Sequence, residues 1–475
     1  MLKSVNYNSL VNGEWVNGNS KFGVFNPANQ SLIGEVFDVG KKGAETAIIS
    51  AQRAFSTWSL RTSDERANIL MNWFNLILKN REEISKIITL ESGKPIGESL
   101  IEVEYGASFI KWFAEQAKRI KGNVLSTNDN SKRMLIYKQP IGVVSAITPW
   151  NFPLAMITRK ASAALAAGCT VVLKPSELTP ITANRIAELS LEAGFPKGIF
   201  NVINGNPLQI GEVMSTHKFV KKITFTGSTK VGKYLMKNAS DSIKGISLEL
   251  GGNAPFVIFD DADLNDSVEG FILCKFRNAG QTCISANRLF VHEKIYDTFM
   301  DKLTKRIKNL TIDDGLKNPD IGPLISEKAI LKIEDHIQDA ISKGAKILIG
   351  GKKSSKGKFF FEPSVIINVS QEMKVFKEEN FGPIIPVIKF STDEEVVNYC
   401  NSTNYGLAAY FFTKNQNRIW KFSENLEYGM FGINTGKIST YQNPFGGWKE
   451  SGIGREGSEE GLEPFLEKKF VNWKI

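Results

Sequence analysis

Two glycine-marked segments of this sequence contain a carboxylate and a thiol that together could form and hydrolyse a thioester. Glu249 lies in the segment Leu-Glu-Leu-Gly-Gly-Asn, and Cys283 ends the segment Asn-Ala-Gly-Gln-Thr-Cys. A nucleophilic cysteine needs a partner that activates either the thiol or the water that follows it. The three histidines of the chain, His217, His292 and His336, are not in motif-like settings. Glu249 is therefore the better candidate base, and the pattern differs from that of a Cys-His hydrolase.

A third segment suggests a bound nucleotide. The apolar run at 222–225 leads into Thr-Gly-Ser-Thr-Lys-Val-Gly-Lys at 226–233, a strand-turn-helix pattern in which a phosphate would sit at the helix N-terminus. The string nearly matches a P-loop, but Tyr234 occupies the position where a Ser or Thr hydroxyl should hold magnesium. An NTPase and an ordinary glycine turn remain as alternatives to a dinucleotide site.

Two further loops follow predicted strands and carry polar groups. Lys174 and Glu177 lie at the end of one strand, where ligands bind in parallel α/β folds. Asn151 lies in the proline-flanked loop 148–153 and offers an amide donor of the kind that an oxyanion hole needs. Taken singly, each of these residues also fits a solvated surface or turn position. The other cysteines, Cys169, Cys274 and Cys400, lie in apolar stretches typical of inert, buried thiols.

The secondary-structure elements that must position these groups show two hydrophobic patterns. Apolar residues at helical spacing in 47–58 and 69–78, the latter behind the N-cap candidate Ser63, predict that the first hundred residues are mainly helical. Beyond residue 140, short apolar strands alternate with helical patterns in two series, which predicts two parallel α/β domains. The predicted strands are 141–147, 170–173, 199–203, 222–225, 246–250, 256–259, 288–291, 346–349, 386–390, 408–412 and 429–433. The segments 132–138 and 468–474 stand apart and are predicted to pair as a small protruding sheet.

Composition excludes several classes of protein. The chain has 475 residues, of which 42% are hydrophobic and 23% charged, as in a globular protein with large cores. Its formal charge of +9 comes from scattered lysines, without a basic run or basic-aromatic stripe, so we expect no nucleic-acid partner. Four cysteines without CxxC spacing indicate neither a disulfide framework nor a metal site. The N-terminus lacks an apolar signal region and no apolar window is long enough to span a membrane, so we expect a cytoplasmic protein.

Taken together, the motifs closely resemble those of the aldehyde dehydrogenase superfamily over nearly the whole chain. They are TPWNFP at 148–153, KPSE at 174–177, FTGST at 225–229, ELGG at 249–252, GQTC at 280–283, ENFGP at 379–383 and PFGG at 444–447. The resemblance implies an α/β fold with a Rossmann-type NAD-binding domain at 1–121 and 142–250 and an α/β catalytic domain at 251–455. It also implies an oligomerisation segment at 122–141 and 456–475, and hence a homodimer or homotetramer.

The resemblance assigns a role to each matching residue. Cys283 would attack the aldehyde, Asn151 and the Cys283 main-chain N–H would hold the oxyanion, and Glu249 would activate the hydrolytic water. Lys160 and Glu456 match positions linked with proton release. The implied coenzyme is NAD, with NADP less favoured, and no metal is implied. The residues that match coenzyme-binding positions are Thr148, Trp150, Lys174, Ser176, Glu177, Gly227, Ser228, Glu379 and Phe381.

Within the superfamily, the segments 156–160 and 275–278 resemble the succinate-semialdehyde dehydrogenase branch. There, two arginines and a serine clamp the distal carboxylate of the substrate; they map onto Arg159, Arg277 and Ser439, with Phe445 also in the pocket. An arginine fork suits bidentate carboxylate binding. Ser285 stands where some members of this branch have a second cysteine, which excludes a disulfide switch here. The alternatives are glutarate semialdehyde as substrate, a broad aldehyde range, and a noncatalytic nucleotide-binding protein on the same fold.

Overall fold

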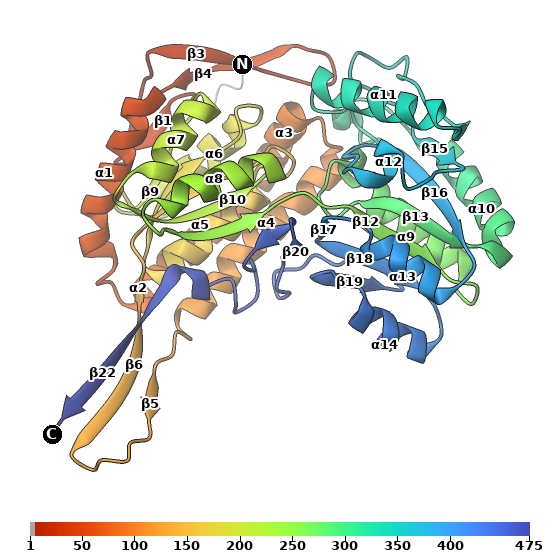
Figure 1. Cartoon of the computed structure of the whole chain (residues 1–475). Helices are drawn as coiled ribbons and strands as arrows, with labels where there is room; N and C mark the ends of the chain where they lie inside the picture. The colour runs from red at the N-terminus through yellow and green to blue at the C-terminus, as the bar shows by residue number, and fades with distance from the viewer. Residues whose placement is uncertain (1–4) are drawn as a thin grey trace.

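Two large β-sheets form the two lobes of the computed structural model, which describes residues 5–475 (Figure 1). The eight-stranded sheet of the first lobe has five parallel strands at its centre, and the N-terminal hairpin and one late strand join its edges in antiparallel pairing. In spatial order its strands are β2 (Glu14–Val16), β1 (Ser9–Val11), β9 (Phe200–Val202), β8 (Thr170–Lys174), β7 (Val143–Ile147), β10 (Val220–Thr226), β11 (Gly245–Glu249) and β21 (Gly452–Ile453). The strand order reverses at β7, so the loops that follow β7, β8, β10 and β11 converge at one edge, where ligands bind in such sheets.

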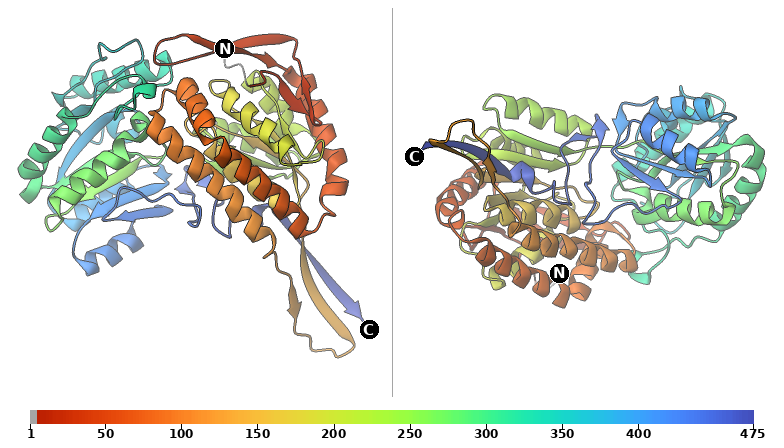
Figure 2. Two further views of the ribbon diagram at one scale, coloured as in Figure 1. Left: turned by 180° about the vertical axis from the view of Figure 1, so that it is seen from behind. Right: turned by 90° about the horizontal axis from the view of Figure 1, so that it is seen from below.

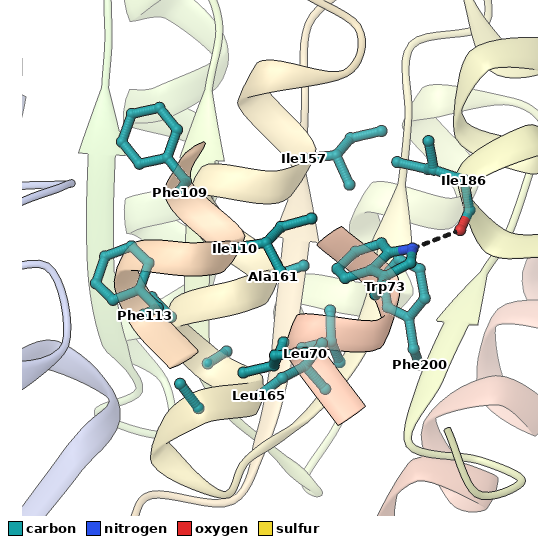
Figure 3. Close-up of a cluster of buried hydrophobic side chains, with 14 of the residues drawn as sticks. Leu70, Trp73, Phe109, Ile110, Phe113, Ile157, Ala161, Leu165, Ile186 and Phe200 are labelled. Carbon is teal, nitrogen blue, oxygen red and sulfur yellow. Dashed lines mark hydrogen bonds between the residues drawn. The ribbon is translucent and has the colours of Figure 1, made fainter. Parts of the chain in front are cut away.

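Helices from the first half of the chain cover this sheet. They are α1 (Gly40–Trp58), α2 (Ser63–Lys79), α3 (Arg81–Ser92), α4 (Ile96–Ala117), α5 (Ala155–Ala167), α6 (Pro180–Glu192), α7 (Pro207–Thr216) and α8 (Thr229–Ser240). Every residue of α5 is buried, because α2 and α4 pack against it around the core that Figure 3 shows. In that core the indole N–H of Trp73 donates to the main-chain oxygen of Ile186 at 2.9 Å.

The second lobe contains a seven-stranded sheet that is parallel except at one edge. Its order is β14 (Lys346–Ile349), β15 (Ser364–Ile367), β16 (Ile384–Phe390), β13 (Ala286–His292), β12 (Ala254–Ile258), β18 (Ala408–Phe412) and β19 (Met430–Ile433). Its helices are α9 (Leu264–Phe276), α10 (Tyr296–Lys308), α11 (Glu327–Ser342), α12 (Lys374–Lys377), α13 (Asp393–Asn401) and α14 (Gln416–Asn425). The loop between α9 and β13 carries Cys283 at the side that faces the first lobe.

A third, smaller sheet projects from the first lobe (Figures 1 and 2). It consists of β5 (Asn123–Leu125), β6 (Lys132–Pro140) and β22 (Leu466–Lys474), with β6 in the middle. The antiparallel register pairs Lys138 with Lys468 and Lys132 with Lys474. This confirms the predicted pairing of two segments that are more than 300 residues apart.

The structure differs from the predicted elements mainly in short strands. The first forty residues contain β1, β2 and the hairpin of β3 (Ser20–Phe25) and β4 (Leu32–Asp38), so the mainly helical interpretation holds only from residue 40. Strand β15 was not predicted, and β14 pairs with it in antiparallel fashion. The N-cap of α2 is Thr62 rather than Ser63, because Thr62 and Glu65 form a reciprocal capping box.

The remaining elements are short. They are β17 (Tyr405–Gly406), β20 (Trp448–Lys449) and the 3₁₀ turns η1 (Arg277–Gly280), η2 (Glu293–Ile295), η3 (Gly315–Lys317) and η4 (Glu463–Phe465). Within residues 5–475, no helix has the length and apolar character needed to cross a membrane.

Candidate active site

A cavity of about 570 Å³ opens between the two large sheets and collects residues from both lobes. Most of the predicted site residues line it: Trp150, Asn151, Arg159, Glu177, Gly227, Ser228, Arg277, Cys283, Glu379, Phe381, Ser439 and Phe445. The others, Thr148, Lys160, Lys174, Ser176, Glu249 and Glu456, are not part of its lining; all six are buried. The predicted residues therefore divide into groups that face the cavity and groups that lie next to or behind it.

A strained turn holds Cys283 in the cavity wall. Asn278 and Ala279 adopt left-handed backbone angles, with φ of 51° and 55°, a conformation that is unfavourable for residues other than glycine. At Gly280, where φ is +78°, an added Cβ would lie 2.4 Å from the main-chain oxygen of Gly382. Only glycine fits at this position, so the backbone conformation of the loop is tightly constrained. Strain of this kind persists only where the surroundings hold it in place, and it is frequent at active sites.

The Cys283 thiol is half-buried, and its environment opposes ionisation. Burial raises its pKa to about 12, and the nearby Glu379 carboxylate acts in the same direction, while Arg159 and Arg277 act against it. A thiolate is the reactive form of cysteine. Catalysis at neutral pH therefore requires that the thiolate be stabilised or formed as it reacts, because little of it is present beforehand.

Asn151 lies beside the nucleophile loop in the turn that follows β7. Its side-chain N–H donates to the main-chain oxygen of Gln281 at 3.1 Å, two residues before Cys283. Its own main-chain oxygen accepts hydrogen bonds from Lys94 Nζ at 2.8 Å and from the Asn278 side chain at 3.1 Å. The second amide hydrogen of Asn151 remains available for an oxygen atom in the cavity, as the predicted oxyanion role requires.

Glu249 is the last residue of β11 and is 1% exposed. One of its carboxylate oxygens, Oε2, has no hydrogen-bond partner within residues 5–475. An added Cβ at Gly446 would lie 3.0 Å from Oε1, so the glycine leaves room for the carboxylate. Burial and, next, the negative charge of Glu456 raise the pKa of Glu249 well above its usual value. A carboxylate with a raised pKa is a stronger base than an exposed glutamate.

Behind Glu249, the carboxylate of Glu456 is held by two cations of α5. Arg159 Nε lies 2.7 Å from Glu456 Oε2, and Lys160 Nζ contacts Oε1. Lys160 also donates to the hydroxyl of Thr226 at 2.6 Å. Burial alone would raise the pKa of Glu456, but Lys160 and Arg159 outweigh it and the pKa is lowered. Glu456 is thus an anion that neutralises the buried cations, and it adjoins the base.

The two predicted clamp arginines differ in their surroundings. Arg159 is 1% exposed and stacks 4.2 Å from the Phe445 ring centroid, and its Nη1 atom has no hydrogen-bond partner in the described part of the chain. Arg277 is half-buried, lies 4.9 Å from the Phe152 ring centroid and forms no ion pair within residues 5–475. Both guanidinium groups line the cavity that Cys283 also lines. An anionic group in that cavity would meet the Arg277 cation, which has no ion-pair partner in the described residues, and the free Nη1 donor of Arg159.

Tyr105 and Phe152 line the same cavity and were not predicted. The Tyr105 hydroxyl is hydrogen-bonded to the Ser439 hydroxyl, so Ser439 is joined to a second polar group from α4. Phe152 stands between the Lys94 and Arg277 cations, at 3.8 and 4.9 Å from its ring centroid. Phe152 belongs to the TPWNFP motif and could have been included on that basis. Tyr105 lies within a regular helical pattern, and no local signal distinguishes it.

Gly227 and Ser228, two of the residues predicted to bind a coenzyme, lie at the N-terminus of α8. Ser228 caps this helix, accepting the N–H of Val231 at 3.4 Å, and an added Cβ at Gly227 would collide with the Phe225 ring at 2.3 Å. The open N-terminus and the close backbone approach suit a pyrophosphate. Glu177 pairs with Lys174 at 3.1 Å and keeps 43% of its side chain exposed, so its carboxylate is accessible. These residues fit a dinucleotide.

Glu379 and Phe381 occupy the side of the cavity nearest Cys283. Glu379 Oε1 accepts the N–H of Gly252 at 2.9 Å, and burial raises the pKa of Glu379 to about 7. Phe381 has a left-handed φ of 55° and its ring meets the Trp150 ring edge to face, with a centroid distance of 5.6 Å.

Thr148 and Ser176 do not line the cavity. The main-chain N–H of Thr148 donates to the main-chain oxygen of Lys174 at 3.1 Å, and the Ser176 hydroxyl caps its own turn. Residues 5–475 contain no group of three His, Cys, Asp or Glu residues arranged to hold a metal ion.

Comparisons with known proteins show which family the chain resembles. Residues 15–471 match the model of the aldehyde dehydrogenase family. The chain is 50% identical over 466 residues to an NADP⁺-dependent succinate-semialdehyde dehydrogenase of Escherichia coli, covering 98% of this chain and 97% of that one. It is 48% identical to a glutarate-semialdehyde dehydrogenase of Pseudomonas aeruginosa, with 98% and 96% covered. A betaine aldehyde dehydrogenase from Staphylococcus aureus, solved in complex with NAD⁺, superposes with a TM-score of 0.97 at 37% identity, with 99% and 95% covered.

Proposed function

Because the chain belongs to the aldehyde dehydrogenase family, we propose that it oxidises an aldehyde with a distal carboxylate, succinate semialdehyde first, to the dicarboxylate with NAD. The observation that carries this proposal is that Arg159 and Arg277 both line the cavity of Cys283, where, within residues 5–475, Arg277 forms no ion pair and Arg159 Nη1 has no hydrogen-bond partner. A guanidinium fork matches a carboxylate in shape and charge. A neutral aldehyde would leave the Arg277 cation without a counter-charge.

The first half-reaction would begin at Cys283. As thiolate it attacks the aldehyde carbon, and the resulting oxyanion accepts hydrogen bonds from the Asn151 amide and the Cys283 main-chain N–H. Preorganised donors of this kind are typically worth about 10²- to 10³-fold in rate each. A nicotinamide held beside Glu379 and Phe381 would supply the acceptor for the hydride that leaves the same carbon. The sulfur of Cys283 is then part of a thioester, and the Asn151 amide polarises the carbonyl of that thioester.

The second half-reaction would depend on Glu249. Its raised pKa favours removing a proton from water, which attacks the thioester and releases the acid and the Cys283 thiolate. Glu249 must then lose that proton before the next cycle. Lys160 and Glu456 adjoin it as one buried ion pair, and we propose that they carry the proton away. The water-derived oxygen ends in the product carboxylate.

Coenzyme preference would depend on Glu177. Its carboxylate, half-exposed beside Lys174, is suited to accept the ribose 2′-hydroxyl of NAD. The 2′-phosphate of NADP would meet the same carboxylate with like charge. A relative of 50% identity is named as an NADP⁺ enzyme, so the ratio of kcat/KM with NAD to kcat/KM with NADP is the measurement that tests the role of Glu177.

The protruding sheet would serve self-association. Its strands expose large apolar side chains, among them Val124 at 77%, Phe470 at 58% and Trp473 at 59%. Apolar side chains exposed together on a projecting sheet indicate a contact surface, and we propose a homodimer or homotetramer formed through residues 122–141 and 456–475. For the rest of the chain, we propose a coenzyme domain of residues 1–121 and 142–250 and a catalytic domain of residues 251–455.

A substrate panel tests the proposal. NADH or NADPH absorbance is followed with succinate semialdehyde, glutarate semialdehyde and butanal, each with both coenzymes. We expect the highest kcat/KM with succinate semialdehyde and NAD. Equal efficiency with butanal would argue for a broad aldehyde range, and a higher value with glutarate semialdehyde would identify the longer substrate. Binding of NAD without turnover of any aldehyde would favour the noncatalytic alternative.

A further inference from the structure

A buried ion pair lies directly behind the Asn151 loop. Lys94, in the turn between α3 and α4, donates to the carboxylate of Glu102 on α4, and neither side chain has exposed surface. Lys94 Nζ also donates to the main-chain oxygen of Asn151 at 2.8 Å and lies 3.8 Å from the Phe152 ring centroid. One ammonium group therefore joins α4 to the loop that supplies the oxyanion donor.

Glu102 extends this connection to α5. Its Oε1 atom accepts the main-chain N–H groups of Leu154 at 3.0 Å and Ala155 at 3.3 Å, at the start of that helix. The first N–H groups of a helix have no partner within the helix, and a carboxylate there also interacts favourably with the helix dipole. Since α5 carries Arg159 and Lys160, Glu102 fixes the start of the helix that presents both cations.

A second carboxylate from the same segment reaches the nucleophile loop. Glu98 accepts the N–H of Asn278 at 2.7 Å, and burial raises the pKa of Glu98 to about 7. Asn278 in turn donates its side-chain N–H to the main-chain oxygen of Asn151 at 3.1 Å. Lys94 and Asn278 thus approach the same oxygen atom from two lobes of the molecule.

We infer that Lys94 and Glu102 are positioning residues of the proposed oxidation, holding Asn151 so that its amide meets the oxyanion formed at Cys283. The inference rests on the proposed function. Replacing a buried ion pair with apolar groups is often neutral or stabilising, so stability is a poor reason for its presence. A displacement of a reacting group by 1 Å, in contrast, costs a rate factor on the order of 10². The pair converges on Asn151, where such a displacement would matter.

The double variant Lys94→Met/Glu102→Gln tests this inference. Either single change leaves one buried charge without its partner, whereas the double variant removes both charges and keeps an amide oxygen at the start of α5. We expect the double variant to melt at a higher temperature than either single variant. Its kcat should remain about 10- to 100-fold below that of the wild type, while KM and the dissociation constant for the coenzyme change less than about threefold.

Glu91 provides a matched control in the neighbouring helix. It is also a fully buried carboxylate, and it caps α6 through the N–H groups of Ile181 at 2.5 Å and Thr182 at 2.9 Å. Within residues 5–475, its hydrogen bonds go to Ile181 and Thr182 and none goes to Asn151 or to the start of α5. Glu91→Gln should lower the melting temperature by an amount similar to Glu102→Gln while kcat stays within about twofold of the wild type.

The outcomes separate this inference from the proposed function. If the double variant recovers both stability and kcat, Lys94 and Glu102 are structural only and the inference is wrong. If Glu91→Gln lowers kcat as strongly, general destabilisation explains the effect. Every ratio uses the aldehyde that the wild type oxidises best, so a wrong substrate assignment does not affect it. Lys94→Arg, which keeps the charge and a donor, should recover part of the lost kcat.

Discussion

Replacing Arg277 with alanine gives the sharpest test of substrate class. The side chain makes no ion pair within residues 5–475, and its one described contact is with the Phe152 ring at 4.9 Å. Losing such a cation–π contact costs about 0.5–1 kcal/mol, so the variant should fold. Arg159 is less suitable, because it also holds Glu456 at 2.7 Å and its loss would disturb the group behind the base.

The expected effect on catalysis is larger and selective. A hydrogen bond to a charged group contributes about 1.5–3 kcal/mol, which at 1.4 kcal/mol per factor of ten is roughly a 10- to 150-fold loss of kcat/KM for succinate semialdehyde. Butanal lacks the distal carboxylate, so its kcat/KM should change less than about threefold. Arg277→Lys keeps the charge but loses the planar fork and should give an intermediate value.

The assay follows NADH absorbance for both aldehydes with wild type and variant under identical conditions. Because a folding defect would depress both substrates equally, the ratio of the two kcat/KM values isolates the clamp. An equal loss for both substrates, or wild-type efficiency with butanal equal to that with succinate semialdehyde, would refute the carboxylate clamp.

The remaining predictions concern the thioester chemistry, the coenzyme and the thiol. Cys283→Ala should abolish oxidation while NAD still binds, and residual turnover above a few per cent would contradict the nucleophile. Glu249→Gln should release one burst of NADH and then turn over slowly as acyl-enzyme accumulates; mass spectra without the acyl adduct would argue against its role. Glu177→Ser should raise kcat/KM with NADP relative to NAD, and an unchanged ratio would exclude Glu177 as the discriminator. Because burial raises the pKa of Cys283 to about 12, its thiolate fraction in the coenzyme-free protein should rise tenfold per pH unit. Alkylation by iodoacetamide, followed by peptide mass spectrometry, should then accelerate about 100-fold from pH 7 to pH 9, and a plateau near pH 8 would contradict the shift.

Local signals account for the parts of the site that the sequence predicted. Cys283, Asn151 and Glu249 each follow a strand or helix within a short motif of glycine or proline, and those motifs are recognisable without knowledge of the fold. Lys94, Glu102 and Tyr105 have no such signal. They act across 50 or more residues of sequence, Glu102 and Tyr105 from α4 and Lys94 from the turn before it, and only the packing of the folded chain brings them to the site.

Strand length explains why β1 and β2 were not predicted, but not why the hairpin of β3 and β4 was missed, since these strands have six and seven residues. The strands β1 and β2 are three residues long, and β2 is largely solvent-accessible, so neither shows a periodic pattern. In contrast, β7 and β8 are almost entirely buried and read as continuous apolar runs, as strands covered on both faces do. The pairing of β6 with β22 was predictable because residues 132–138 alternate in polarity and both segments lie outside the two α/β series.

The order in which the chain is made has a consequence for when the enzyme becomes active. Strand β21 joins the first sheet beside β11, Glu456 neutralises two cations of α5, and β22 completes the protruding sheet; all three come from residues 452–475. During synthesis, Arg159 and Lys160 emerge about 300 residues before their shared anion. Until then α5 cannot be buried without leaving two charges unpaired, which costs several kcal/mol. The first lobe therefore cannot pack completely around α5 before residues 452–475 are made, and we expect the cavity that holds the Cys283 thiol to form only after that.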